Sequence, residues 1–268
     1  MANIIIPDGG TIGSTSDTDA ISIASDGQVT IENLKLTPQT EPTSPSEGQI
    51  YYDSSDNLVK YYDGNFFRTF DSQSLLDPFS DNSQIAFWKF EDNLNDEHNT
   101  YNLTGSSMAY RAGFKGSGMD CTASNYASFP TFSGLTNFSV SFRLNLDSGG
   151  NGKYIFGHQS YGQLLHNSGE LKLYKGAEYS WTGSPTMSTN TPYHIVLSVS
   201  SGTVTLYLNN TQYTGNTASM SLNSGYIGTA STQSGNSTYA MDGMIDEIRV
   251  FNKALTSGEV STLYTNDL

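Results

Sequence analysis

The sequence predicts an all-β protein whose larger part is a β-sandwich or jelly roll. Charged residues make up only 14% of the 268 residues, whereas Gly, Ser, Thr and Asn are abundant and Tyr occurs 17 times. This composition suits short strands joined by small polar turns and argues against a helix bundle. Apolar residues also alternate with polar ones in several closely spaced segments, which is the pattern of half-buried strands.

The alternation is strictest over residues 138–146, where every even position is apolar. A period of two predicts a strand with one buried face and one solvated face. Residues 195–199 and 204–208 repeat the pattern on either side of a Ser-Ser-Gly turn, which predicts an antiparallel pair. We expect further strands at the following positions: residues 154–156, 163–165, 171–174, 226–228 and 244–251.

One helix is expected near the C-terminus. Thr256 followed by Glu259 has the spacing of a capping box, with Thr as the N-cap residue. Val260, Leu263 and Tyr264 then fall on one helical face. The sequence therefore predicts a short helix that packs on the sandwich.

The first 70 residues form a separate arm. The turn signal Asp26-Gly27 separates residues 21–23 from residues 29–31, which predicts a hairpin. A proline-rich segment follows, and residues 50–67 are predicted to form a small meander. A meander of this size needs to pack against another part of the structure, and neighbouring subunits are the obvious candidate. We expect an oligomerisation arm at residues 1–70, a linker at 71–83 and a jelly roll at 84–268.

The charge balance excludes two classes of partner. The formal net charge is −14 and the sequence pI is near 4.4. Such a chain repels nucleic acid and anionic membranes, although the charge also fits simple solubility. Cys121 is the single cysteine, so no intramolecular disulfide is expected. No apolar run suits a transmembrane helix or a signal peptide, and we expect folding in a reducing cytoplasm.

Several motifs resemble one family. Residues 241–260 resemble the closing strand and helix of LamG-like (laminin G type 3) jelly rolls, which have a concanavalin A-like fold. Residues 86–96 resemble the family's first strand and loop, and residues 138–142 a further strand of the family, with Arg143 where an aromatic residue is usual. Residues 193–196 and 206–210 match two further motifs in the expected order. The resemblance covers residues 84–268 and implies a concanavalin A-like jelly-roll β-sandwich.

The arm resembles a different group of proteins. Residues 10–23 and 45–53 look like N-terminal segments of structural proteins from marine phages. Such segments precede adhesin domains in tail fibres, which are commonly trimers. The resemblance implies a virion surface location, attachment to other virion proteins through the arm, and a homotrimer.

The LamG-like resemblance also implies calcium. Ca²⁺ needs six to eight oxygen ligands, and residues 91–96 supply a dense set of oxygens in one loop. Our predicted ligands are Asp92, Asp96 and, from the closing strand, Asp246. The same residues also fit the roles of turn formers and solvated charges, and the sequence leaves both interpretations open.

Sugar binding needs exposed aromatic rings beside polar groups. Trp181 is flanked by Ser and Thr-Gly, which is unusual for a core residue. We expect the ligand-binding residues among the aromatic side chains of the loop segments, with packing as the alternative for each: Tyr161, His166, Tyr179, Trp181 and Tyr239, together with Tyr174. Trp88, inside an apolar strand, is expected in the core.

Catalysis is not expected. Glucanases of this fold use two carboxylates across a cleft, and their Glu-x-Asp-x-x-Glu spacing is missing here. Asp246 and Glu247 are adjacent, so a regular strand would point them to opposite faces. The four histidines show no metal-ligand spacing, and Cys121 suits a small buried hydrophobe.

Three functions remain open at this stage. The first is a virion fibre or appendage whose jelly roll binds a host-surface glycan or receptor. The second is a capsid decoration protein without a ligand. The third is a cryptic glycan hydrolase, which would need a carboxylate pair in a cleft. An exposed aromatic groove favours the first, and a flat polar outer face favours the second.

Overall fold

The computed structural model describes residues 11–14, 17–23, 29–31, 34–55, 58–62, 64, 67–69, 77–231 and 236–266. The chain divides into two compact units, Met1–Phe70 and Asp71–Leu268. Residues 77–83 fall in the range that the sequence assigns to a linker, but they pack into the second unit, where Asp77 and Ser83 are buried. The prediction of an all-β fold is confirmed, since almost every regular element is a strand.

The first unit begins with a three-stranded antiparallel sheet. Its strands are β1 (Thr11–Ser14), β2 (Asp17–Ile23) and β3 (Val29–Ile31), in the order β1-β2-β3. Ile23 lies opposite Val29 and Ile21 opposite Ile31, so the predicted hairpin forms. Its turn at Asp26-Gly27 lies outside the described residues.

A four-stranded sheet completes the first unit. Strand β4 (Pro38–Gln39) runs parallel to β5 (Ile50–Asp53), and β6 (Leu58–Tyr62) and β7 (Phe67–Thr69) follow as an antiparallel meander. The rings of Tyr51 and Phe67 pack edge to face at 4.7 Å. Asp53 accepts hydrogen bonds from the Tyr51 hydroxyl and from Lys60, each at 2.8 Å. The predicted meander is therefore present, and Phe67 contacts both Tyr51 and Tyr62 within it.

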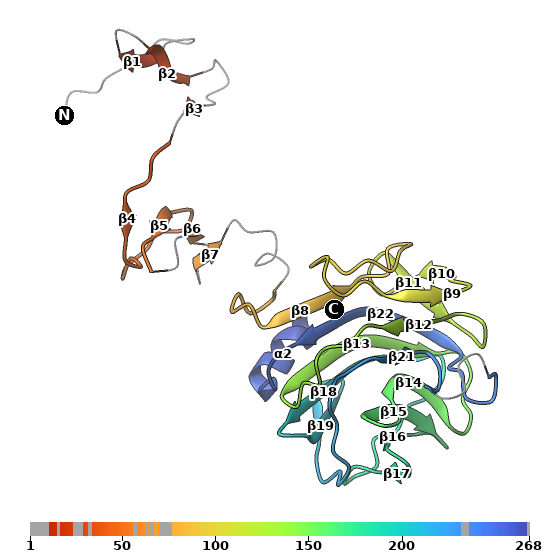
Figure 1. Ribbon diagram of the computed structural model, residues 1–268. Coiled ribbons are helices and arrows are strands. Elements are labelled where there is room, and N and C mark those ends of the chain that lie inside the picture. The colour runs from red at the N-terminus through yellow and green to blue at the C-terminus, as the bar shows by residue number, and fades with distance from the viewer. Residues whose placement is uncertain are drawn as a thin grey trace. The chain divides into compact units, whose positions relative to one another are not determined.

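The second unit is a sandwich of two antiparallel sheets (Figure 1). The eight-stranded sheet runs in the order β10 (Tyr110–Ala112), β11 (Ser117–Cys121), β22 (Gly243–Phe251), β13 (Phe138–Leu146), β18 (Pro192–Ser200), β19 (Thr203–Leu208) and β20 (Thr211–Tyr213), with β8 (Gln84–Trp88) also paired to β22. The seven-stranded sheet runs in the order β17 (Glu178–Tyr179), β16 (Glu170–Tyr174), β15 (Gly162–Asn167), β14 (Lys153–His158), β21 (Gly225–Ile227), β12 (Tyr126–Phe129) and β9 (Thr104–Ser106).

The main core lies between these two sheets. Phe129 and Phe156 stack within it at a ring distance of 4.8 Å. Trp88 is fully buried, as predicted, and its indole N–H donates to the Tyr101 carbonyl oxygen at 2.8 Å. Cys121 is also buried, and burial raises the pKa of its thiol above the usual range, which fits the predicted hydrophobic role.

The helix α2 (Ser257–Asn266) covers the outer face of the eight-stranded sheet. Thr256 and Glu259 form the predicted capping box: the Thr256 N–H donates to the Glu259 carboxylate at 2.8 Å, and the Glu259 N–H donates to the Thr256 hydroxyl at 3.3 Å. Val260 and Leu263 then pack on β18, β19 and β22.

This cover corrects the prediction of one solvated face along residues 138–146. Ser139, Ser141 and Arg143 are buried, although they point away from the main core. Hydrogen bonds replace the lost water: the Ser139 hydroxyl donates to the Lys253 carbonyl oxygen at 3.0 Å.

Among the described residues, no helix is long and apolar enough to cross a membrane.

Candidate functional site

The outer face of the seven-stranded sheet carries a group of half-buried tyrosines. Tyr154 on β14 lies opposite Leu165 on β15, which in turn lies opposite Lys172 on β16. Opposed residues of an antiparallel pair share a face, and successive residues alternate between faces. Because Leu164 and Leu173 point into the core, this row points outward. We call this surface the tyrosine face and define it by five residues: Tyr126, Tyr154, Tyr174, Tyr226 and Tyr239.

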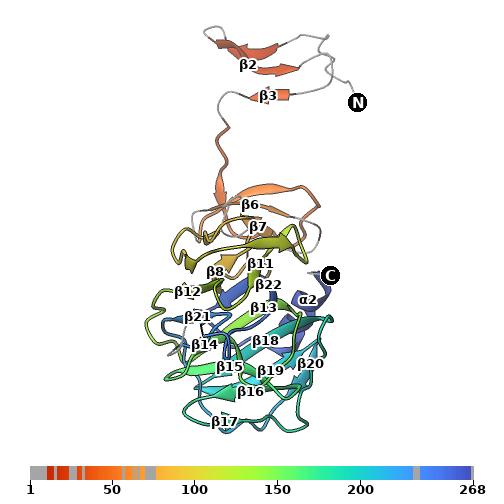
Figure 2. The same ribbon diagram turned by 90° about the vertical axis from the view of Figure 1, so that its right-hand side faces the viewer.

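Tyr154 is at the centre of the tyrosine face. Its ring meets that of Tyr174 at 5.6 Å and that of Tyr239 at 6.0 Å, both in edge-to-face contacts. Tyr239 comes from the loop before β22, and its carbonyl oxygen accepts a hydrogen bond from the Tyr154 N–H at 3.0 Å. Tyr126 and Tyr226, on the neighbouring strands β12 and β21, have ring centres 6.4 Å apart. Figure 2 shows the strands β14, β15 and β16 side by side.

Charged and amide groups lie beside the rings. The Lys172 ammonium is 3.2 Å from the Glu178 carboxylate and 3.8 Å from that of Glu170. The Asn167 amide donates to Glu178 at 2.7 Å. Glu178 also lies opposite Tyr174 in the register of β16 and β17. The surface therefore combines apolar rings with hydrogen-bonding groups of both signs.

The Tyr154 hydroxyl stays protonated at neutral pH. Burial, together with the smaller effects of the neighbouring Tyr174, Glu178 and Tyr239, raises the pKa of Tyr154 to about 12. A protonated phenol both donates and accepts one hydrogen bond, so Tyr154 can pair with a ligand hydroxyl in either sense.

The structure places the predicted ligand residues in different environments. Tyr239 belongs to the tyrosine face, and Tyr174 joins it. Tyr161 lies in the turn between β14 and β15, where its ring packs against His158 at 5.2 Å. Tyr179 lies opposite Leu173 at the edge strand β17 and packs against the main core.

Trp181 and His166 are buried, which corrects the expectation that they are exposed. Trp181 is 2% exposed, and its indole N–H donates to the Val204 carbonyl oxygen at 3.1 Å. His166 is 3% exposed and lies opposite Leu171 on the core side of the sheet, where burial lowers its pKa. Neither side chain can present a face to a ligand in this arrangement.

Three tyrosines of the face, Tyr126, Tyr154 and Tyr226, were missed by the sequence reasoning. Tyr154 lies in a strand, as predicted, whereas the predicted ligand residues lie in segments expected to be loops. Strict alternation would place Tyr154 on the same face as the buried Phe156, and it is the register shift between these two residues that turns Tyr154 outward.

The predicted calcium ligands are not brought together as one set. Asp96 is buried, and its two carboxylate oxygens accept hydrogen bonds from four backbone N–H groups. Asp246 is buried and accepts the N–H groups of Phe114 and Lys115, and burial raises its pKa to about 7. Asp92 is exposed. In the described part of the chain, no three Asp, Glu, His or Cys side chains form a group that could hold a metal ion. Calcium binding stays a prediction.

Asp246 and Glu247 also depart from the expected geometry. The register between β13 and β22 shifts beside them, and Glu247 has a φ of 52°, so the strand contains a bulge. Asp246 lies opposite Arg143, and Glu247 contacts Arg249 at 3.3 Å. The bulge therefore breaks the alternation and places both carboxylates on the outer face of the eight-stranded sheet, where both are buried.

Comparison with known families gives one match. The model of the laminin G type 3 family, described as the concanavalin A-like lectin/glucanases superfamily, matches residues 121–261. This range contains all five residues of the tyrosine face, from Tyr126 to Tyr239. No curated protein matches the chain.

Solved structures share the fold at low sequence identity. Domain 4 of AbnA, an extracellular arabinanase from Geobacillus stearothermophilus solved with arabinotriose, is 17% identical with a TM-score of 0.53, over 68% of this chain and 98% of that domain. Trypanosoma rangeli sialidase in complex with sialic acid is 17% identical with a TM-score of 0.54, over 69% of this chain and 33% of the sialidase. The binding domain of Paraclostridial Mosquitocidal Protein 1 is 14% identical with a TM-score of 0.52, over 69% of this chain and 52% of that one.

Proposed function

The chain belongs to the concanavalin A-like lectin/glucanases superfamily, and on this premise we propose that its second unit is a glycan-binding module without catalytic activity. The binding surface is the tyrosine face. The observation that carries this proposal is the contact of Tyr154 with Tyr174 and Tyr239, which gathers three aromatic rings on the outer face of one sheet.

The chemistry of the tyrosine face suits a sugar chain. A pyranose ring has apolar C–H patches bordered by hydroxyl groups, and tyrosine offers an apolar ring with a polar tip. The edge-to-face contacts and the half-burial of Tyr154 fix the rings before binding, which reduces the entropy lost when a ligand is held. Lys172, Glu178 and Asn167 supply donors and acceptors beside the rings.

Structural neighbours support the ligand class. The AbnA domain was solved with arabinotriose, and the sialidase with sialic acid. The mosquitocidal protein contributes a domain named for binding. At 14–17% identity these likenesses concern the fold, and the assignment of a glycan to this chain rests on the tyrosine face.

The contacts of the carboxylates support a binding role over hydrolysis. Glycoside hydrolysis needs two carboxyl groups about 5–10 Å apart on either side of the scissile bond. On the tyrosine face, Glu170 and Glu178 both bind the ammonium of Lys172. Asp246 and Glu247 are buried, with their oxygens directed at backbone N–H groups and at Arg249.

We further propose that the protein is a phage virion surface component, such as a tail fibre or appendage, that binds a host-surface glycan. The support is the resemblance of residues 10–23 and 45–53 to phage structural proteins. The first unit would attach to other virion proteins and form a homotrimer. In the part of the chain that the structure describes, every large apolar side chain that is exposed belongs to this unit: Leu34, Ile50, Leu58 and Val59.

A glycan array and whole-cell binding assay with the full chain tests the proposal. We expect saturable binding that Tyr154→Ala and Tyr174→Ala each abolish or weaken strongly, while the matched control Tyr161→Ala, a half-buried tyrosine outside the tyrosine face, binds like the wild type. Parallel assays in calcium and in EDTA test the calcium prediction. Absence of binding by the multivalent protein would contradict the proposal and favour a capsid decoration role, and release of sugar products would favour a hydrolase.

A further inference from the structure

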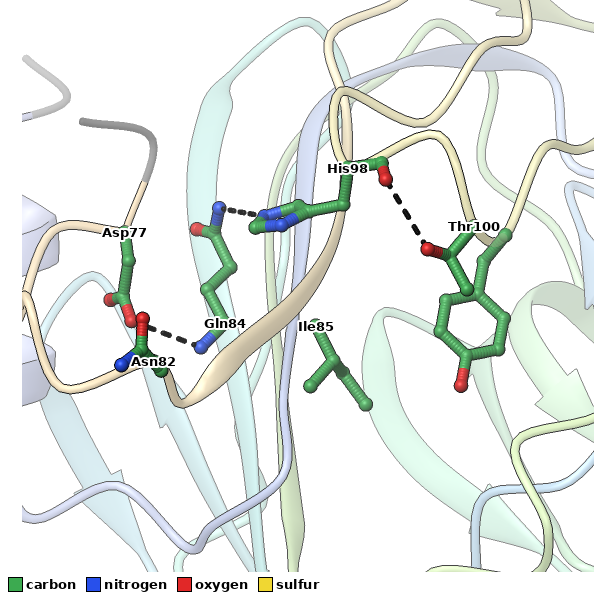
Figure 3. Close-up of a pocket in the computed structure, with 7 residues that line it drawn as sticks. Asp77, Asn82, Gln84, Ile85, His98 and Thr100 are labelled. Atoms are coloured by element: carbon green, nitrogen blue, oxygen red, sulfur yellow. Dashed lines mark hydrogen bonds between the residues drawn. The ribbon is translucent and has the colours of Figure 1, made fainter. Parts of the chain in front are cut away.

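A separate pocket lies beside β8 in the second unit. Its volume is about 270 Å³. The pocket is built from the segment before β8, from β8 itself and from the loop between β8 and β9 (Figure 3). Seven residues line it, and none belongs to the tyrosine face: Asp77, Asn82, Gln84, Ile85, His98, Thr100 and Tyr101.

A hydrogen-bond chain fixes the orientation of the Gln84 amide at this pocket. The Arg249 guanidinium donates to the Gln84 amide oxygen at 3.0 Å. Arginine can only donate, so the amide oxygen must face Arg249 and the amide NH₂ must face His98. The Gln84 amide nitrogen lies 3.0 Å from the His98 Nε2. Figure 3 marks this contact with a dashed line.

These hydrogen bonds determine the tautomer of His98. Because Gln84 donates, the His98 Nε2 accepts and the ring proton resides on Nδ1. Within the described residues, His98 Nδ1 makes no hydrogen bond. His98 therefore offers an N–H donor that no described residue accepts.

The other lining residues add unused polar groups. Across the described ranges, neither the Asn82 side-chain amide nor the Tyr101 hydroxyl makes a hydrogen bond. The Asp77 carboxylate accepts one N–H on each oxygen, from Phe79 and from Gln84, and each oxygen can accept a second bond. The pocket therefore offers both donors and acceptors.

The apolar part of the pocket is rigid. Ile85 is half-buried in β8, and the Tyr101 ring stacks on Phe132 with ring centres 4.2 Å apart and planes 21° apart. The stack holds the Tyr101 ring in one orientation. An apolar wall beside mixed polar groups is the usual make-up of a small-molecule site.

We propose that this pocket binds one neutral sugar residue, as a second site that is independent of the tyrosine face. The volume lies just below that of pockets for drug-sized ligands, which are about 300–1,000 Å³, and so suits a single ring. An anion is disfavoured because the lining contains the Asp77 carboxylate and no Lys or Arg. A cation would leave the N–H donors of His98 and Asn82 unused. The ligand class rests on the proposed function, whereas the location does not.

Methyl signals distinguish the two sites. The full chain is labelled with ¹³C at Ile and Leu methyl groups, because Ile85 lines the pocket and Leu165 lies opposite Tyr154. The probes are the methyl glycosides of glucose, galactose and mannose. We expect at least one of them to shift the Ile85 signal saturably. Longer oligosaccharides that bind the tyrosine face shift Leu165.

Matched variants assign the Ile85 shift to the pocket. Tyr101→Phe removes only a hydroxyl group, and Asn82→Gly removes an amide at a residue whose φ of 58° suits glycine. Each variant should bind the methyl glycoside roughly two- to tenfold more weakly, as expected for the loss of one hydrogen bond. Tyr174→Ala should leave the Ile85 titration unchanged.

Three results would overturn the proposal. The first is a silent Ile85 signal with every methyl glycoside, and a Leu165 shift in the same samples would then leave the tyrosine-face proposal intact. The second is an Ile85 titration that Tyr101→Phe and Asn82→Gly do not change. The third is an Ile85 shift that tetramethylammonium ions cause and none of the methyl glycosides causes, which would identify a cation site.

Discussion

Tyr154 and Tyr174 meet in an edge-to-face contact at 5.6 Å although they come from β14 and β16, two strands that β15 separates. Their rings therefore bridge over the intervening strand. The contact depends on the register of two strand pairs at once, since Tyr154 lies opposite Leu165 and Tyr174 lies opposite Gln163. A rigid aromatic surface of this kind is the feature on which the proposed glycan binding depends.

The hydroxyl group and the ring of Tyr154 should contribute separately to binding. Tyr154→Phe keeps the ring and should lower the affinity for the glycan about two- to tenfold, as expected for one lost hydrogen bond. Tyr154→Ala removes the central ring and should weaken binding by more than tenfold. Isothermal titration with the best glycan from the array measures both. Equal affinities of the two variants would show that the ring makes no contact with the ligand.

Trp181→Phe tests the burial of the indole ring. The substitution should lower the free energy of unfolding by about 1–3 kcal/mol, because the Val204 carbonyl oxygen loses its donor and a small cavity forms. Glycan affinity should stay unchanged, since Trp181 lies in the core. Urea unfolding and the glycan titration give the two values. A large loss of glycan affinity at unchanged stability would show instead that Trp181 contacts the glycan.

The strands could be predicted because their signal is local. Residues 138–146 show the period of two within nine positions, and β13 spans the same range. The capping box at Thr256 is equally local, since both partners lie three residues apart. Features of this kind follow from the preferences of neighbouring residues alone.

The site could not be predicted in the same way because it depends on contacts between distant segments. Trp181 has small polar neighbours in the sequence, but its burial comes from β19, to which its indole N–H donates. The covered face of β13 depends on α2, more than 100 residues later. The bulge at Glu247 is set by pairing with β13, and the sequence of β22 alone does not reveal it.

Thr256→Ala tests the role of the cap in holding α2 on the sheet. Loss of the hydroxyl that accepts the Glu259 N–H should lower the free energy of unfolding by about 1 kcal/mol. Thr262→Ala is the matched control, because Thr262 is exposed within the helix and alanine favours the helical state. Urea unfolding of both variants gives the comparison. A control that loses as much stability as Thr256→Ala would remove the cap as the explanation.

His194 should make the stability of the second unit depend on pH. Its Nε2 is 2.7 Å from the Ser141 hydroxyl, and Tyr264 of α2 stacks on its ring. Burial lowers the pKa of His194 to about 3, and the nearby Arg143 and Arg249 lower it in the same direction. As the pH falls below about 6.5, His194 becomes protonated in the unfolded chain but stays neutral in the folded chain. This stabilising contribution is complete above pH 6.5 and is lost as the pH falls toward 3.

The comparison of wild type with His194→Gln isolates this contribution. Between pH 7 and pH 4 the wild type should lose on the order of 3 kcal/mol more unfolding free energy than the variant, because glutamine does not titrate. Urea unfolding at both pH values supplies the four free energies that the difference requires. His158→Gln is the control, since His158 is only half-buried and should change the pH dependence much less. If the two histidine variants keep the same pH dependence as the wild type, His194 is already protonated in the folded protein at pH 4, and the space beneath α2 must then admit water or a counter-ion.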